Sequence, residues 1–177
     1  RVSKKIFESS SFGSEIEKQG HYKEELSSLL DNTTNDSQKI TTIYQFVKSK
    51  IKWNRRNGKY TFLGTKKSYK EGEGNVADIN LNLVSMLRYA GLEANPVLVS
   101  TRANGVFFFP TLKGFNYVIA SVIISNKIIL LDASEFYAVP NQLPLRAINW
   151  EGRLVKKDGT SISVNLAPEK ISSEDNF

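Results

Sequence analysis

The sequence predicts an α+β domain, because helical periodicity fills its first half and β patterns fill its second half. Apolar residues recur at helical spacing within residues 22–30, 35–51 and 75–90. Short apolar runs separated by turn signals follow, at residues 95–101, 115–124, 127–134 and 150–166. Helices first and hairpins afterwards predict a central helix packed on an antiparallel sheet.

The helices before residue 75 are predicted from caps and apolar stripes. Residues 1–20 mix Ser, Gly and charge, which favours a loosely ordered lead-in with one helical turn, followed by a helix at 22–30. Asn35 is a helix cap with Gln38 in the capping-box position, and the next stripe is Ile40, Ile43, Tyr44, Val47 and Ile51. Residues 54–74 show no sustained period, so we expect a long surface loop there.

The helix at residues 75–90 is predicted to lie in the middle of the fold, because its apolar residues cover more than one side. Gly91 stands where a C-terminal glycine cap belongs. The strands that follow are expected to turn at Ser125-Asn126 and at Asp158-Gly159. Phe107 to Phe109 lie in a loop interrupted by Gly and Pro, where they either enter the core or contact a neighbouring domain.

The length of 177 residues suits one domain. We divide it into an N-terminal lead-in and helix (1–35), the main domain (36–167) and a polar tail (168–177). The sequence starts at Arg1 rather than Met, so we expect a fragment of a longer protein. No apolar run has the length of a membrane span, and no signal-type segment is present.

Two residue counts restrict the chemistry. Cysteine is absent, which excludes thiol catalysis, disulfides and cysteine metal sites. His21 is the single histidine, so neither a histidine-based triad nor a two-histidine metal site can be built. We expect His21 to be a solvent-facing helix residue, and we predict no cofactor and no metal.

The net charge of +6 is concentrated in one segment. Residues 48–70 contain nine Lys or Arg and no acid, which leaves 15 bases against 18 acids elsewhere, a net −3. Aromatic residues are interleaved with these bases. Either this is a solvated loop with its aromatic rings turned inward, or it binds single-stranded nucleic acid or an anionic glycan. The candidate binding residues are Trp53, Arg55, Arg56 and Tyr60.

Several segments together carry a family resemblance. Gly74-Asn75 opens the central helix, "LRYAGLEANPVLVS" ends it and begins a strand, and "FNYVIASV" and "KIILLDAS" follow. This pattern resembles the transglutaminase-like family, whose core reads Gly-x-Cys at a helix start, then a histidine strand and a strand ending in aspartate. The resemblance covers residues 36–135 and implies a papain-like fold. It is similar above all to bacterial members found in large exported proteins.

The resemblance also implies where the catalytic residues would stand. In active members the helix start favours a thiolate, the histidine pairs with it and the aspartate orients the histidine. We align the cysteine with Asn75, the histidine with Asn116 and the aspartate with Asp132, so only the aspartate remains. Simple structural roles are the alternative: Asn75 as a helix cap, Asn116 bonded to backbone, and Asp132 bonded to Asn116 or a turn N–H. If the triad has degenerated, the three side chains should converge.

These observations predict a non-catalytic transglutaminase-like domain that serves as a binding or scaffolding module in a larger exported bacterial protein. Its partners would be other domains of the same chain, or a protein or glycan ligand in the cell envelope, with nucleic acid disfavoured. The competing function is a peptidase or acyltransferase with an unusual nucleophile, for which Ser85, Ser100 and Tyr117 are the candidates. An anion-binding module based on residues 48–70 is the third.

Overall fold

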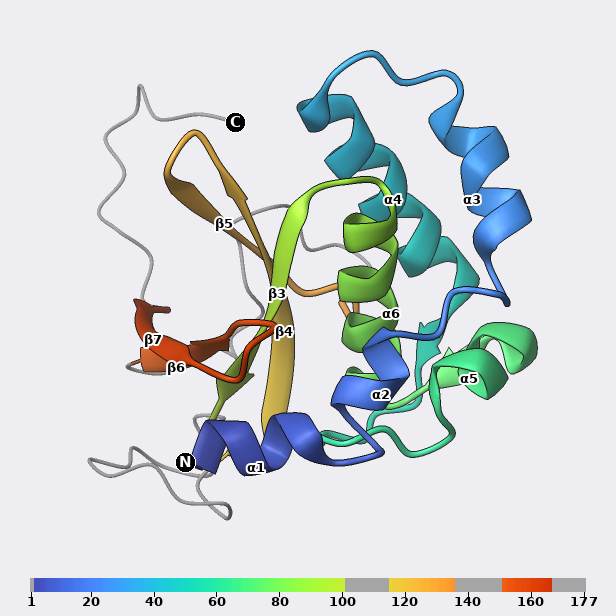
Figure 1. The fold of residues 1–177 in the computed structure, drawn as a ribbon. Coiled ribbons are helices and arrows are strands. Elements are labelled where there is room, and N and C mark those ends of the chain that lie inside the picture. Colours follow the sequence, from blue (N-terminus) through green and yellow to red (C-terminus); the bar gives the residue numbers. More distant parts are fainter. Residues whose placement is uncertain (1, 101–114, 136–150, 167–177) are drawn as a thin grey trace.

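The computed structural model describes residues 2–100, 115–135 and 151–166. Its helices are α1 (Val2–Glu8), α2 (Gly13–Ile16), α3 (Lys23–Leu30), α4 (Asp36–Lys50), α5 (Thr65–Glu71) and α6 (Val76–Tyr89). Its strands are β1 (Lys52–Trp53), β2 (Glu73–Gly74), β3 (Glu93–Val99), β4 (Tyr117–Ile124), β5 (Lys127–Leu131), β6 (Glu151–Val155) and β7 (Ser161–Asn165). Helices α2 to α6 lie on one side and the larger sheet on the other, while α1 lies at the lower end of the sheet (Figure 1). The predicted α+β class is confirmed.

The larger sheet has five strands in the order β5-β4-β3-β6-β7, and every neighbouring pair is antiparallel. β4 and β5 form the hairpin predicted at Ser125-Asn126, where both residues have positive φ, 51° and 65°. β6 and β7 form the second predicted hairpin, with Gly159 at φ 86° in its turn. A small parallel pair, β1 with β2, lies outside this sheet.

Helix α6 occupies the centre, between the sheet and the helices α2, α4 and α5 (Figure 1). Every residue from Val76 to Leu87 is buried, as the apolar pattern predicts. Its start is fixed by a capping box, in which Asn75 Oδ1 accepts from Asp78 N and the Asp78 carboxylate accepts from Asn75 N. Its end is followed by Gly91 in the left-handed region, at φ 88°.

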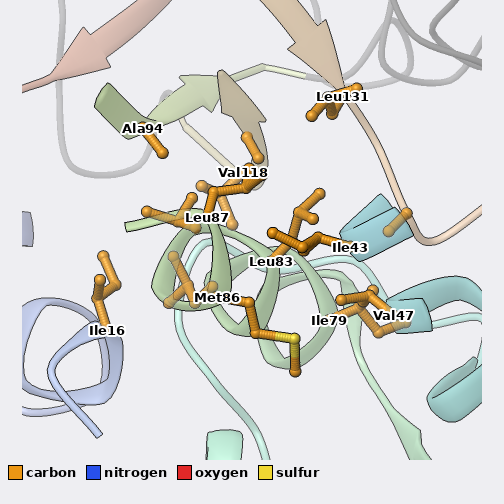
Figure 2. Close-up of a cluster of buried hydrophobic side chains, with 14 of the residues drawn as sticks. Ile16, Ile43, Val47, Ile79, Leu83, Met86, Leu87, Ala94, Val118 and Leu131 are labelled. Carbon is orange, nitrogen blue, oxygen red and sulfur yellow. The ribbon is translucent and has the colours of Figure 1, made fainter. Parts of the chain in front are cut away.

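Two hydrophobic cores lie on the two faces of the sheet. The first is built around α6, where Leu83 and Leu87 lie near Val118 from β4. Side chains of α2 and α4 complete it from the two flanks of α6 (Figure 2). The second core includes Val97, Tyr117 and Ile119, the alternate positions of β3 and β4. Val76, the first residue of α6, also belongs to the second core.

Three local expectations are wrong. Residues 1–20 are not a loose lead-in, because Ile6, Phe12 and Ile16 are buried in the first core. Residues 54–74 are not loop throughout, since they contain α5, whose Thr65, Ser68 and Tyr69 are buried. His21 is half-buried just before α3, with its Nε2 2.9 Å from Asn82 Oδ1 and its ring against Tyr22 and Tyr69. Burial lowers the pKa of His21.

Some predictions fall outside the described residues, namely Phe107 to Phe109 and the polar tail at 168–177. In the part of the chain that the structure describes, no helix combines the length and hydropathy that a membrane crossing requires.

Candidate functional site

The start of α6 is the first part of the candidate site. Asn75 is the N-cap, and both ends of its side chain are engaged: Oδ1 accepts from Asp78 N at 2.8 Å, and Nδ2 donates to Tyr60 O at 3.0 Å. The first helical residue is Val76, which is fully buried. The Val76 backbone N–H donates to Arg56 O at 3.2 Å. The structural role of Asn75 as a helix cap is therefore confirmed.

Asp132 follows β5 and is completely buried. Its Oδ1 accepts from Asn80 Nδ2 at 3.0 Å, from Ser134 N at 3.0 Å and from Ser134 Oγ at 2.6 Å. Its Oδ2 accepts from the Tyr117 hydroxyl at 2.5 Å. The carboxylate thus has four donors, one of them the turn N–H that the sequence suggested.

Among the contacts of the described residues, the Asp132 carboxylate bonds Tyr117 rather than Asn116. Asn116 is half-buried just before β4, and its backbone N–H donates to Val99 O at 3.1 Å. The side chain that reaches Asp132 belongs to the next residue, Tyr117. A shift of one position is decisive here, because neighbouring residues on a strand project in different directions.

A similar one-residue shift applies at the helix start. With Gly74 as the glycine of a Gly-x-Cys pattern, the third position is Val76 rather than Asn75. Val76 is also the first residue inside the helix, and it shares the second core with Tyr117. Val76 and Tyr117 thus lie in one core and Tyr117 bonds Asp132, whereas Asn75 caps the helix.

Asn80 belongs to the network around Asp132, and the sequence did not single it out. Its Nδ2 donates to Val118 O at 2.9 Å and to Asp132 Oδ1, and its Oδ1 accepts from Ala133 N at 2.9 Å. One side chain on α6 therefore joins β4 to the chain that follows β5. The available signal was an asparagine between Ile79 and Leu81 in a helix expected at the centre of the fold, since buried amides are retained only with partners.

Tyr44 completes this network from α4. Its hydroxyl donates to Asp132 O at 3.2 Å, and burial raises the pKa of Tyr44, with the nearby Asp132 carboxylate acting in the same direction. The tyrosine is thus held in its neutral, donating form. Asp132 is consequently tied to α4, α6 and β4 at once.

A second buried carboxylate, Asp78, organises the loop before α5. It accepts backbone N–H bonds from Phe62 at 3.1 Å, Leu63 at 3.2 Å and Gly64 at 3.0 Å, besides that of Asn75. Burial raises the pKa of Asp78, and these four backbone donors offset part of that rise. Glu15 fixes the next residue, because its Oε1 accepts from Thr65 N at 2.6 Å.

The basic segment places its candidate residues next to the helix start. Trp53 and Tyr60 are half-buried against the first core, whereas Arg55 and Arg56 are exposed. Arg55 lies over the Trp53 ring with 5.4 Å between its guanidinium carbon and the ring centroid, and Lys59 Nζ lies 5.0 Å from the Tyr60 centroid. The expectation of inward aromatic rings holds for Trp53 and Tyr60 in part, but Phe62 is 61% exposed.

The other candidate nucleophiles, Ser85, Ser100 and Tyr117, are all buried. Ser85 is buried, with its Oγ 2.6 Å from the Tyr22 hydroxyl and donating to Lys18 O at 3.1 Å. Burial raises the pKa of Tyr22 to about 12. Tyr117 is fully buried, and Ser100 is 7% exposed. Among the residues described, no cluster of His, Asp and Glu has the composition of a metal site.

A central helix that packs on an antiparallel sheet and bonds a buried aspartate through Asn80 defines the class of this protein, an α+β domain of the papain-like type. The model of the transglutaminase-like superfamily matches residues 24–137. The chain belongs to this superfamily. Because the sequence contains no cysteine, the nucleophile typical of the family is absent.

A solved structure supports the same fold. A crystal structure of a "putative protease" from Parabacteroides distasonis matches with a TM-score of 0.60 and 15% sequence identity. The match covers 95% of this chain and 31% of that chain, so the present chain spans about a third of the other protein. At this identity the likeness concerns the fold alone. No curated protein matches the sequence.

Proposed function

We propose that this domain is a non-catalytic member of the transglutaminase-like superfamily. In this proposal Val76 occupies the cysteine position and Tyr117 the histidine position, while Asp132 is the retained aspartate. Valine has no nucleophilic group. A tyrosine hydroxyl that donates to a carboxylate cannot activate a nucleophile as a histidine base does near neutral pH.

One observation carries the proposal: all three side chains have 0% exposure. A catalytic group must reach its substrate, and these three side chains are buried in the protein interior. The helix start is also occupied, since Val76 N–H bonds to Arg56 O and Asp78 N–H bonds to Asn75 Oδ1. These are among the unpaired donors that would otherwise stabilise an anion at a helix N-terminus.

The retained aspartate has a structural purpose in this proposal. Asp132 accepts from Tyr117, Asn80 and Ser134 and so connects two strands to the central helix. In an active triad such a carboxylate would orient a histidine. Here the same position orients a tyrosine and strengthens the packing of α6 on β4.

The second part of the proposal is that the domain binds or positions a partner within a longer protein. Its support is that the chain covers 31% of the matched protein while 95% of its own length is matched. An exported, bacterial envelope location rests on the family resemblance and is part of the proposal. The protease description belongs to the matched protein.

The test is an activity assay on the purified domain. We expect no amide hydrolysis and no glutamine–amine crosslinking above the level of a buffer control, because the described nucleophiles are buried and bonded. Tyr117→Phe is the matched variant, since it removes only the hydroxyl that faces Asp132. Turnover that co-purifies with the native domain and disappears in Tyr117→Phe would show an active site at this position.

A further inference from the structure

The surface beside the helix start carries two stacked pairs of arginine and aromatic residues, namely Arg55 with Trp53 and Arg56 with Phe62. The Arg55 guanidinium carbon lies 5.4 Å from the Trp53 ring centroid, and that of Arg56 lies 5.3 Å from the Phe62 centroid. Both arginines are exposed, and Phe62 is 61% exposed. We call these four residues the arginine–aromatic surface.

The backbone under this surface is fixed. Trp53 Nε1 donates to Arg56 O at 2.9 Å, and Arg56 N donates to Asn54 Oδ1 at 2.9 Å. Phe62 N donates to the buried Asp78 carboxylate. Arg55 has φ 73°, in the left-handed region that a residue with a side chain rarely adopts. Such a conformation persists only where the surrounding contacts determine it, and it is common at binding sites.

The charge of this surface is not balanced locally. Residues 48–70 contain nine Lys or Arg and no acid. Lys50 and Lys67 are paired with Glu25 and Glu71 from outside the segment. The guanidinium groups of Arg55 and Arg56 have no acceptor in the part of the chain that the structure describes. Forked donors that are already oriented by ring stacking fit a carboxylate in a bidentate manner.

The aromatic rings favour a peptide over a sugar or a nucleobase. Stacking of sugars and bases needs an open ring face, but Trp53 packs against both cores and lies under Arg55. Its ring thus supports a guanidinium group. Phe62 also has an arginine, Arg56, over its ring, but at 61% exposure it still offers an apolar surface beside the arginines. A partner that matches two arginines beside an exposed ring needs carboxylates and an apolar side chain close to them. Acidic peptides carry both kinds of side chain.

We propose that the arginine–aromatic surface docks an acidic protein segment, in which Asp or Glu side chains bind Arg55 and Arg56 and an apolar side chain packs on Phe62. This inference rests on the proposed non-catalytic function and names the class of partner. The partner would approach from solvent, next to the closed helix start where Arg56 O receives the Val76 N–H.

The test is fluorescence anisotropy with a labelled peptide in which Asp and Glu alternate with leucine, against the same peptide with Asn and Gln. We expect the acidic peptide to bind and the neutral peptide to bind at least about tenfold more weakly.

Replacing both arginines (Arg55→Glu with Arg56→Glu) should weaken binding at least about tenfold, and Phe62→Ser about threefold, because each removes one part of the contact. The matched control is Lys66→Glu with Lys67→Glu, which has the same charge change on α5 and should weaken binding less than about threefold.

All variants should melt within about 2 °C of the native domain, since the changed side chains are exposed. If the arginine and the lysine double variants lose binding equally, the peptide responds only to the net charge of the domain. That result would overturn the proposal. Tighter binding of heparin or single-stranded DNA, unaffected by Phe62→Ser, would overturn it in favour of another polyanion. If the domain shows neither peptide binding nor catalytic turnover, only the proposed docking role of the arginine–aromatic surface is refuted. If it shows catalytic turnover, the proposed non-catalytic function is refuted.

Discussion

Replacing Asp78 with alanine is expected to lower the free energy of unfolding by about 3–5 kcal/mol. The Asp78 carboxylate accepts backbone N–H bonds from Asn75, Phe62, Leu63 and Gly64, and its side chain is fully buried. Hydrogen bonds to a charged group contribute about 1.5–3 kcal/mol each, and a buried donor left without a partner costs about 1–3 kcal/mol. Relaxation of the loop and entry of water keep the total below the sum.

Urea denaturation followed by circular dichroism measures this loss. Glu93→Ala is the matched control, because Glu93 is an exposed acid at the start of β3 and should change stability by less than about 0.5 kcal/mol. If Asp78→Ala costs no more than the control, then the carboxylate does not hold the loop at residues 62–64, and the rigid base assigned to the arginine–aromatic surface is lost with it.

Replacing Asp132 with alanine is expected to cost about 3 kcal/mol or more. This substitution removes the shared acceptor of Asn80, Tyr117 and Ser134, all of which are buried. Its effect should exceed that of Tyr117→Phe, which removes a single donor and should cost about 1.5–3 kcal/mol. The same denaturation experiment measures both variants.

A double-mutant cycle separates the Tyr117–Asp132 contact from the rest of the network. The two residues are bonded directly, so the combined variant should lose less than the sum of the single losses, with a coupling of about 1 kcal/mol or more. Strict additivity would show that the hydroxyl and the carboxylate do not support each other, and a negligible loss in Asp132→Ala would leave the retained aspartate without its structural role.

Most of the fold follows from local sequence signals. The 3.6-residue period of α6, the cap residues Asn35 and Asn75, and the turn residues Ser125, Asn126 and Gly159 each act within a few positions along the chain. Such signals predict helices, strands and hairpins, and with the order of elements they predict the α+β class. The helices α1 and α5 were missed because they are short and depend on tertiary contacts, such as Thr65 with Glu15.

The site was predicted less well, because it depends on register. The sequence pointed to Asn75 and Asn116, whereas the structure bonds Tyr117 to Asp132 and packs Val76 and Tyr117 in one core. Asn75 and Asn116 suggest themselves because a polar amide is a common replacement for a polar catalytic side chain. Only the direction of side chains from the helix start and the strand shows which neighbour faces Asp132. The contacts of Asn80 and His21 with residues more than fifty positions away leave no local signal.

The superfamily fold tolerates the loss of its nucleophile for a physical reason. The helix start and the aspartate strand are held together by capping, by the second core and by the Asp132 network. None of these contacts requires a thiol or an imidazole. In the proposed alignment Val76 and Tyr117 take the cysteine and histidine positions, and the tyrosine donates a hydrogen bond to the buried aspartate.

The assignment of Val76, Tyr117 and Asp132 to the triad positions can be tested directly, because the chain has no cysteine of its own. One variant combines Val76→Cys with Tyr117→His, and the comparison variant combines Asn75→Cys with Asn116→His. The measurement is the pH dependence of the ultraviolet absorbance of the thiolate, which needs no reagent to reach the buried position 76, with the urea-unfolded proteins as reference. We predict that the thiol pKa in the first variant lies at least about one unit below its ordinary value near 8.5, because a histidine oriented by Asp132 stabilises the thiolate. The comparison variant should titrate near the ordinary value. A lowered thiol pKa in the Asn75 and Asn116 variant alone, or in neither variant, would contradict the account.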